Sequence, residues 1–378
     1  CALGGCGSSS SVVDATPADA AVDAPAVCTP ACGTHAVCTG TTCACMSGYL
    51  GDGQVCTDVD ECATGNGGCD ADAACTNTDG ARTCACRPGF VGDGLACQPV
   101  WQRVASFASV TFPSNAKQMS AAIGPRLFFA TDGADASSFF RSFDTATGTL
   151  SGPLNVAPGE FCDCGLAQIF TSSGASIFMF GNQGNRYDPA ADRWVALAGY
   201  NNQLGRGEAG GAVDPATGTM FMVAGRDGPG AYQGSAVRLA TDGEVSVEPG
   251  TMPVPFRDPQ AYVMPGTSTL YVAGGHAADN NQRHLYRHAL GATPWEPLGD
   301  APADLSPGRG IGHYTPTLLY VATDAGLYFF DTSTNAWRPE PIAGPPGFQR
   351  AISADGAVWA ITSSPGVGLE IHRLLAID

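Results

Sequence analysis

The segment FDTSTNAW, residues 330–337, places an aromatic residue seven positions before a tryptophan, with mostly small polar residues between them. Two other segments repeat this arrangement closely and two repeat its spacing: FDTATGTL (143–150), YDPAADRW (187–194), Arg238 with Val245, and His288 with Trp295. The last positions of consecutive copies are 44, 51, 50 and 42 residues apart. A unit that recurs at this interval indicates a protein built from structural repeats.

A short apolar segment that runs into Gly or Asp precedes each copy. These segments are LFFATDG (127–133), IFMFGNQG (177–184), MFMVAGRDG (220–228), LYVAGGHA (270–277) and LLYVATDAG (318–326). A sixth segment, VWAITSSPG (358–366), is followed by LEIHRLLAID (369–378), where the sequence stops. Short apolar runs between turn-forming residues predict β-strands, so we expect an all-β domain with little helix.

The repeats resemble kelch repeats, which are about 50 residues long and have four strands, with glycines at the end of the second and a tryptophan on the fourth. The double glycine occurs only at Gly274–Gly275. The resemblance implies a six-bladed β-propeller with tryptophans packed between blades. Radial closure also removes the exposed edges that an open array of sheets would leave. An open β-solenoid is the alternative.

The segment PVWQRVASF, residues 99–107, reads as the last strand of a repeat whose beginning is missing. Trp101 lies 49 residues before Leu150, in step with the repeat, and the sixth unit has only three strands before Asp378. We therefore predict that the strand at 101–107 completes the sixth blade and joins the two ends of a domain at 99–378.

Twelve cysteines between residues 28 and 97 form two sets of six, and each set ends with the spacing C-x-C-x10-C. The last loops contain GYLGDG (48–53) and GFVGDG (89–94). These stretches resemble tandem EGF-like domains, at 28–57 and 58–98. Spacing alone leaves fifteen connectivities for each set. The resemblance implies the pairs Cys28–Cys38, Cys32–Cys43, Cys45–Cys56, Cys62–Cys75, Cys69–Cys84 and Cys86–Cys97.

The second set begins DVDEC (58–62) and has an asparagine two residues after its third cysteine, as in calcium-binding EGF domains. Arg82 stands where that family usually has an aromatic residue. By resemblance, three side chains and three backbone carbonyls would bind calcium: those of Asp58, Glu61 and Asn77, and of Val59, Thr78 and Ala81. Calcium takes six to eight such oxygens. An EGF fold without metal is the alternative, and we expect no calcium in the first domain.

The first 27 residues, CALGGCGSSSSVVDATPADAAVDAPAV, are small and rich in Ser, Ala and Pro, which is typical of a flexible tether. A tether that begins with a cysteine resembles the mature end of a bacterial lipoprotein. The resemblance implies acyl chains on Cys1, and Ala2 at the next position favours the outer membrane. An arbitrary start with a Cys1–Cys6 disulfide is the alternative.

Sixteen cysteines indicate an oxidising compartment. We expect a disulfide between Cys162 and Cys164, with copper binding as the alternative. The segment HAADNNQRHLYRH (276–288) contains three histidines, which we expect on the surface. A formal charge of −17 and a single lysine, Lys117, argue against nucleic acid as a partner.

Basic residues stand at the entry of the innermost strand in five of the six units. They are Lys117, Arg206, Arg257, Arg309 and Arg350, while the remaining unit has Cys164. In a propeller these entries would face one mouth of the central channel, so we predict a site there for a carboxylate, a sulfate or an acidic side chain. Ion pairs with neighbours such as Glu208 and Asp258 are the alternative.

Together these features predict a non-catalytic lipoprotein of the outer membrane that faces the cell surface and binds an envelope protein or glycan. Lipid on Cys1 would hold it at the membrane, and calcium would stiffen its EGF-like pair. The alternative is an enzyme, similar to kelch-type sialic acid epimerases or to copper oxidases of the galactose oxidase kind. In the epimerase case Arg206 would hold the carboxylate of an acidic sugar and Glu208 would act as acid and base.

Overall fold

The computed structural model describes residues 28–110, 118–131, 139–156, 169–180, 183–200, 206–227, 230–339 and 341–375. They form two compact units, one with residues up to Arg87 together with Gly92–Cys97, the other with Pro88–Val91 and the chain from Gln98 onwards. Within these ranges no helix combines the length and the apolar character needed to cross a bilayer.

Residues 28–99, most of which belong to the first unit, form short two-stranded ribbons and two 3-10 turns. The pairs are β1 (Ala36–Thr39) with β2 (Thr42–Cys45), β3 (Tyr49–Gly51) with β4 (Cys56–Asp58), β5 (Ala73–Thr78) with β6 (Ala81–Cys86), and β7 (Phe90–Gly92) with β8 (Cys97–Pro99). The turns are η1 (Glu61–Ala63) and η2 (Gly65–Gly68). Six disulfides join first to third, second to fourth and fifth to sixth cysteine in each set, as the resemblance implies. Because so little of these ribbons is buried, the cross-links stabilise them by restricting the unfolded chain.

The second unit contains six sheets of four or five antiparallel strands. The first two sheets are β10 (Gln118–Ile123), β11 (Arg126–Thr131), β12 (Phe139–Asp144) and β13 (Thr149–Leu150), and then β14 (Ile169–Ser173), β15 (Ser176–Phe180), β16 (Gly184–Asp188) and β17 (Arg193–Ala196). The next two are β19 (Gly210–Val213), β20 (Met220–Val223), β23 (Ala236–Leu239) and β24 (Val245–Val247), and then β26 (Gln260–Met264), β27 (Thr269–Ala273), β29 (Leu285–Ala289) and β30 (Glu296–Pro297). The last two are β31 (Gly310–Thr315), β32 (Leu318–Thr323), β33 (Gly326–Asp331), β34 (Ala336–Trp337) and β35 (Ile342–Ala343), and then β36 (Phe348–Ala354), β37 (Ala357–Ser364), β38 (Gly368–Leu374) and β9 (Trp101–Phe107). We number these sheets blades 1 to 6 in this order. Two small sheets accompany them: β18 (Arg206–Gly207), β21 (Arg226–Asp227) and β22 (Ala231–Tyr232), and β25 (Phe256–Arg257) with β28 (His276–Ala277).

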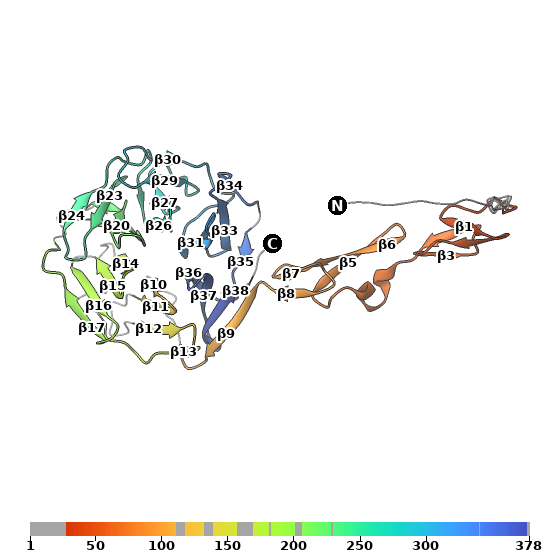
Figure 1. Cartoon of the computed structure of the whole chain (residues 1–378), viewed down its shortest axis with the longest axis horizontal. Coiled ribbons are helices and arrows are strands. Elements are labelled where there is room, and N and C mark those ends of the chain that lie inside the picture. The colour runs from red at the N-terminus through yellow and green to blue at the C-terminus, as the bar shows by residue number, and fades with distance from the viewer. Residues whose placement is uncertain are drawn as a thin grey trace, which may run out of the picture. The chain divides into compact units, whose positions relative to one another are not determined.

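The innermost strands of the six blades form a closed ring. Each of β10, β14, β19, β26 and β31 contacts the innermost strand of the next blade, and β36 contacts β10. Figure 1 shows the blades following one another around a common centre, from β10 to the blue β36. The second unit is therefore a six-bladed propeller, as the repeats predict, and not an open solenoid.

The seven-residue spacing corresponds to a cross-strand pair in blades 1, 2 and 5, whereas in blade 3 Arg238 lies opposite Ser246 and not Val245. Phe330 lies opposite Trp337 in the β33–β34 register, with ring centroids 5.3 Å apart. The aspartate that follows the aromatic residue shapes the turn, since Asp331 Oδ1 accepts hydrogen bonds from the Ser333 and Thr334 amides. A side chain that bonds to the backbone two and three residues on favours a tight turn. The repeated pattern thus encodes the hairpin between the two outer strands of a blade.

Tryptophans pack between neighbouring blades, as expected. Trp194 of blade 2 lies in a buried cluster with Phe128 and Phe140 of blade 1, and its ring is 5.8 Å from that of Phe140. Trp295 of blade 4 lies in a cluster with Phe221 of blade 3. These contacts connect each sheet to its neighbour through apolar surface.

Strand β9 closes the ring, as predicted from its spacing. It pairs with β38 from Leu374 opposite Trp101 to Leu369 opposite Phe107, and Figure 1 shows β9 beside β38. Trp101 Nε1 also donates a 2.9 Å hydrogen bond to the Ala343 carbonyl of blade 5. The N-terminal strand therefore joins the two ends of the propeller.

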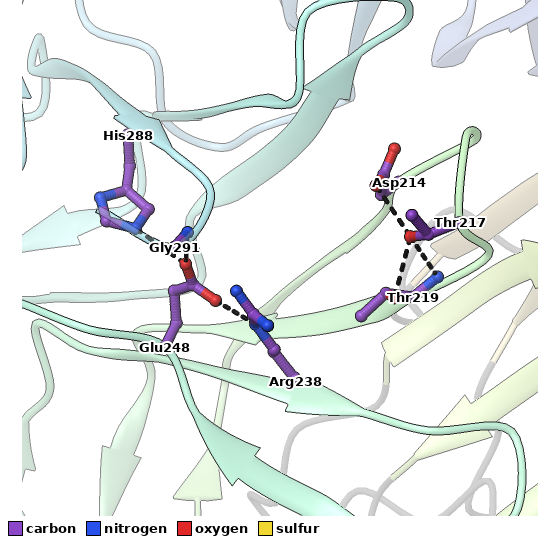
Figure 2. Close-up of polar contacts among 7 residues, drawn as sticks. All are labelled: Asp214, Thr217, Thr219, Arg238, Glu248, His288 and Gly291. Carbon is purple, nitrogen blue, oxygen red and sulfur yellow. Dashed lines mark hydrogen bonds and ion pairs between the residues drawn. The ribbon is translucent and has the colours of Figure 1, made fainter. Parts of the chain in front are cut away.

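A fully buried carboxylate ties blade 3 to blade 4. Glu248, which follows β24, is bonded to Arg238 of its own blade, and accepts hydrogen bonds from the Gly291 amide and from His288 Nε2 of blade 4, the latter at 3.2 Å. Figure 2 shows the carboxylate between the Arg238 and His288 side chains. Burial alone would raise the pKa of Glu248, but the bonds from Arg238, Gly291 and His288 outweigh it and lower the pKa.

Replacing Glu248 with Gln should destabilise the propeller by about 3 kcal/mol, because Arg238 and the Gly291 amide would lose a buried partner charge. Because folding lowers the pKa of Glu248, its ionised carboxylate contributes to the free energy of unfolding above its pKa in the unfolded chain, about 4.3. That contribution is lost as the pH falls through the lower folded-state pKa. The difference in unfolding free energy between wild type and E248Q should therefore shrink in acid. Denaturant unfolding at several pH values measures it, with Glu296→Gln, an exposed ion-paired carboxylate in blade 4, as control.

Deleting residues 101–107 should lower the melting temperature of the propeller by about 10 °C or more, because it exposes the β38 edge and opens the ring. Circular dichroism melts of the full chain measure it. The exposed side-chain variant Val104→Thr keeps the backbone pairing and should melt like wild type. An unchanged melting temperature in the deletion would show that this strand is only a linker.

Candidate functional site

A cavity of about 530 Å³ lies at the centre of the propeller. Every blade contributes to it through its innermost strand, for example by Ser120, Thr171, Gly211, Gln260, Ile311 and Arg350. Because the inner strands converge, residues separated by more than 200 positions in the sequence share one lining.

Arg350 enters this lining from β36. The pairing with β37 shifts between Phe348 and Arg350, so Gln349 is an extra residue in the strand. Such a bulge changes the direction of the side chains beside it. Gln349 turns to accept a 2.7 Å hydrogen bond from Gln118 Nε2 of blade 1, and Arg350 Nε donates to Ser120 Oγ at 3.4 Å.

The Arg350 guanidinium has no carboxylate partner among the described residues. Burial, with a further contribution from the nearby Arg309 charge, lowers the pKa of Arg350 to about 10. The group is thus still protonated at neutral pH and forms a positive centre within the cavity.

Arg309 also lines the cavity, but it is neutralised. Its Nε lies 2.5 Å from Asp324 Oδ1, and its Nη1 donates a long hydrogen bond of 3.5 Å to Gln118 Oε1. Its carbonyl accepts from the Ala351 amide at 2.8 Å, which joins blade 5 to blade 6. The Arg309 backbone therefore helps to join two blades, while its guanidinium lies at the cavity wall.

Arg257 lies just outside the lining, in the small β25–β28 sheet. Its Nη1 is 3.2 Å from Glu208 Oε2, and its guanidinium lies over the Tyr232 ring at 5.9 Å. Arg226 Nη2 holds the other Glu208 oxygen at 2.9 Å. Arg257 and Arg226 thus clamp Glu208 between blades 3 and 4.

The clamp determines what Glu208 can do. Both carboxylate oxygens are occupied by guanidinium groups, whereas a general acid or base needs an oxygen free to exchange a proton with substrate. The geometry therefore favours a structural role for Glu208 over the acid–base role weighed from the sequence.

The five predicted basic residues thus have different surroundings. Arg309 and Arg350 line the cavity, and Arg257 stands beside it in an ion pair. For Arg206 the structure describes the backbone, in β18, but not the side chain. Lys117, Cys162, Cys164 and Cys1 lie outside the described residues.

The three histidines at 276–288 depart from the expectation of a surface position. His288 is fully buried and stacks on Trp295 with centroids 4.4 Å apart. His284 lies between Asp279 and Asp300, at 2.8 and 3.2 Å. His276 lines the cavity, where sequence reasoning did not place it. The cross-strand register opposite Arg257 is the signal that locates it, and this register is visible only in the folded chain.

In the first unit, two of the predicted calcium ligands are in contact. Asn77 Nδ2 donates to Asp58 Oδ2 at 2.7 Å, and the Gly80 amide donates to Asp58 Oδ1 at 2.6 Å. The Gly80 amide and then the Asn77 amide lower the pKa of Asp58, so this carboxylate is ionised at neutral pH.

The third side chain, Glu61, has a buried Oε2 without a hydrogen-bond partner among the described residues. A buried carboxylate oxygen without a partner is costly unless a cation or a donor satisfies it. The predicted carbonyls belong to Val59 in the same entry segment and to Thr78 and Ala81, which pair at the end of the β5–β6 hairpin. This donor set, all oxygen, fits calcium.

Tyr49 of the first EGF-like domain packs on the second beside this region. Its hydroxyl donates to Asp79 Oδ1 at 2.8 Å, which raises the pKa of Tyr49 to about 12, and its ring stacks on His35 at 4.2 Å. A Cβ at Gly80 would come within 2.6 Å of the Tyr49 ring, so only glycine permits this approach. Tyr49 thus stands beside the hairpin turn whose amide holds Asp58.

Comparison with known proteins supports the EGF-like assignment of residues 40–97. Residues 62–97 match the family model described as EGF domain, and residues 40–61 match the one described as Complement Clr-like EGF-like. The chain contains tandem EGF-like domains. Stabilin-2 of Rattus norvegicus is 56% identical over 52 residues, and Stabilin-1 of Homo sapiens is 53% identical over 51 residues. These matches cover 14% and 13% of this chain and only 4% and 2% of the two relatives.

Calcium should raise the melting temperature of the EGF-like pair, and Asp58→Asn should weaken calcium binding at least about tenfold, because the site would lose a charged ligand. Isothermal titration of the full chain measures the affinity. Asp72→Asn removes the same charge at the other end of β5 and should bind calcium like wild type. Equal affinities of D58N and wild type would contradict the ligand set.

Proposed function

We propose that the protein is a non-catalytic binding protein of the cell envelope. In this proposal the tandem EGF-like domains act as a calcium-stiffened spacer, and a kelch-type propeller presents a binding surface to a protein or glycan. The repeat spacing and the double glycine at Gly274–Gly275 support the kelch assignment.

The observation that carries the proposal is the central cavity. All six blades contribute to its lining, and the Arg350 guanidinium stands in it beside the ion-paired guanidinium of Arg309, although the chain has a net charge of −17. A local positive centre in an acidic protein attracts anionic groups to that position. The cavity is thus suited to the recognition of an anionic group on a partner.

The EGF-like pair supports the same role. Asp58, Asn77 and Glu61 offer hard oxygens at the entry of the second domain, and Tyr49 packs against its hairpin turn. Calcium bound there would fix the second domain against the first. A stiff spacer holds a binding domain away from its point of attachment. Lipid on Cys1 and a position in the outer membrane stay predictions from the first 27 residues.

Cross-linking of the full chain in its native envelope, followed by affinity purification, tests the proposal. We expect one envelope protein or glycan to be enriched, and its recovery to fall several-fold for Arg309→Met, which removes a guanidinium from the cavity wall. Arg287→Met removes an ion-paired arginine from β29 of blade 4 and serves as the control for net charge. Absence of any enriched partner, or equal recovery with R309M and R287M, would count against the proposal.

A further inference from the structure

The cavity contains a cation, the Arg350 guanidinium, that no carboxylate of the described residues neutralises. Arg257 and Arg309 each form an ion pair with a carboxylate, whereas the one bond of the Arg350 side chain within the described part of the chain is the 3.4 Å hydrogen bond from Nε to Ser120 Oγ. An acidic residue, Asp258, also belongs to the lining. A partly dehydrated guanidinium without a counter-ion destabilises a fold, so its presence needs a compensating role.

The backbone is shaped to place this cation. The bulge at Gln349 turns Arg350 towards Ser120 while Gln349 bonds to Gln118, both amide side chains being buried. Bulges are frequent beside binding sites because they re-aim a side chain that regular pairing would direct elsewhere. The arrangement therefore positions the guanidinium rather than merely tolerating it.

The rest of the lining mixes small and polar side chains with apolar ones such as Met119, Phe170 and Ile352. Hydroxyl groups come from Ser120, Thr171, Ser172 and Ser353, and amides from Gln118 and Gln260. The volume of about 530 Å³ lies within the range of small-molecule sites. Hydroxyl and amide groups around the Arg350 guanidinium, with Arg309 already paired to Asp324, suit a hydroxylated molecule that carries a single carboxylate.

We propose that the central cavity binds a small polar carboxylic acid whose carboxylate pairs with Arg350. This deepens the proposed function and rests on it in one respect, that the propeller is the binding domain. The carboxylate would supply the two acceptor oxygens that a guanidinium fork bonds best, and its charge would neutralise Arg350. The hydroxyl and amide groups of the lining would bond to the remainder of the molecule.

Isothermal titration with D-glucuronate and D-glucose tests the proposal, since these sugars differ by the carboxylate. Wild type should bind glucuronate at least about tenfold more tightly than glucose, the difference expected for a charge-assisted pair. Arg350→Met should lose that preference, and Arg350→Lys should keep part of it, because lysine keeps the charge and loses the fork. Arg287→Met should bind like wild type.

A second readout separates binding from a structural role. Without acid, R350M should melt at or above the temperature of wild type, because it removes an uncompensated cation, and glucuronate or acetate should raise the melting temperature of wild type alone. A large fall in the melting temperature of R350M, with no effect of either acid on wild type, would show that Arg350 only stabilises the fold and would overturn the proposal.

The remaining outcomes also decide the matter. Equal binding of glucuronate and glucose, or a carboxylate preference that survives in R350M, overturns it. Binding of an oligoglutamate peptide that requires Arg350, with no response to glucuronate or acetate, also overturns it in favour of an acidic segment of a macromolecule. That last result would leave the proposed envelope-binding function intact. Conversely, binding of a small acid without any cross-linked partner would overturn the envelope-binding function and support the small-acid site.

Discussion

The pairing of β9 with β38 is the constraint on which the propeller depends. Without it the sixth blade would end at β38 with an unpaired edge, and the Trp101 bond to blade 5 would be lost. Closure also holds β36 against β10, and this contact brings Gln349 to Gln118 and Arg350 to Ser120. The geometry of the cavity is therefore a consequence of how the ring is closed.

Two kinds of stabilisation serve the two units. The propeller buries large aromatic side chains between blades and can even accommodate a buried charge, Glu248, because three groups from two blades satisfy it. The EGF-like domains bury few side chains and rely on disulfides. Two of their candidate calcium ligands, Asp58 and Asn77, are in contact where the chain passes from one domain to the next, so a cation there would affect the joint directly.

The fold was largely predictable because its signals are local or periodic. The aromatic and aspartate of each repeat encode a hairpin, as Phe330, Asp331 and Trp337 show, and the count of such hairpins, with the orphan strand at 101–107, implies closure. The cavity was predictable only in outline. Aligning strand entries indicated a ring of basic residues and left ion pairs with Glu208 as the alternative, which Arg257 forms. It did not single out Arg226, which belongs to another strand and holds the other oxygen of Glu208.

The sequence by itself determined the all-β repeat architecture, the two six-cysteine domains and the closing strand, because hairpins and cysteine spacing are written along the chain. Only the tertiary structure decided which charges are neutralised. Whether an arginine meets a carboxylate depends on register and on one-residue bulges. Arg257 meets Glu208 across blades, whereas Arg350, beside the extra residue Gln349, forms no ion pair with a described carboxylate. Burial of His288 against Trp295 and Glu248 likewise follows from contact between blades, which no spacing along the chain expresses.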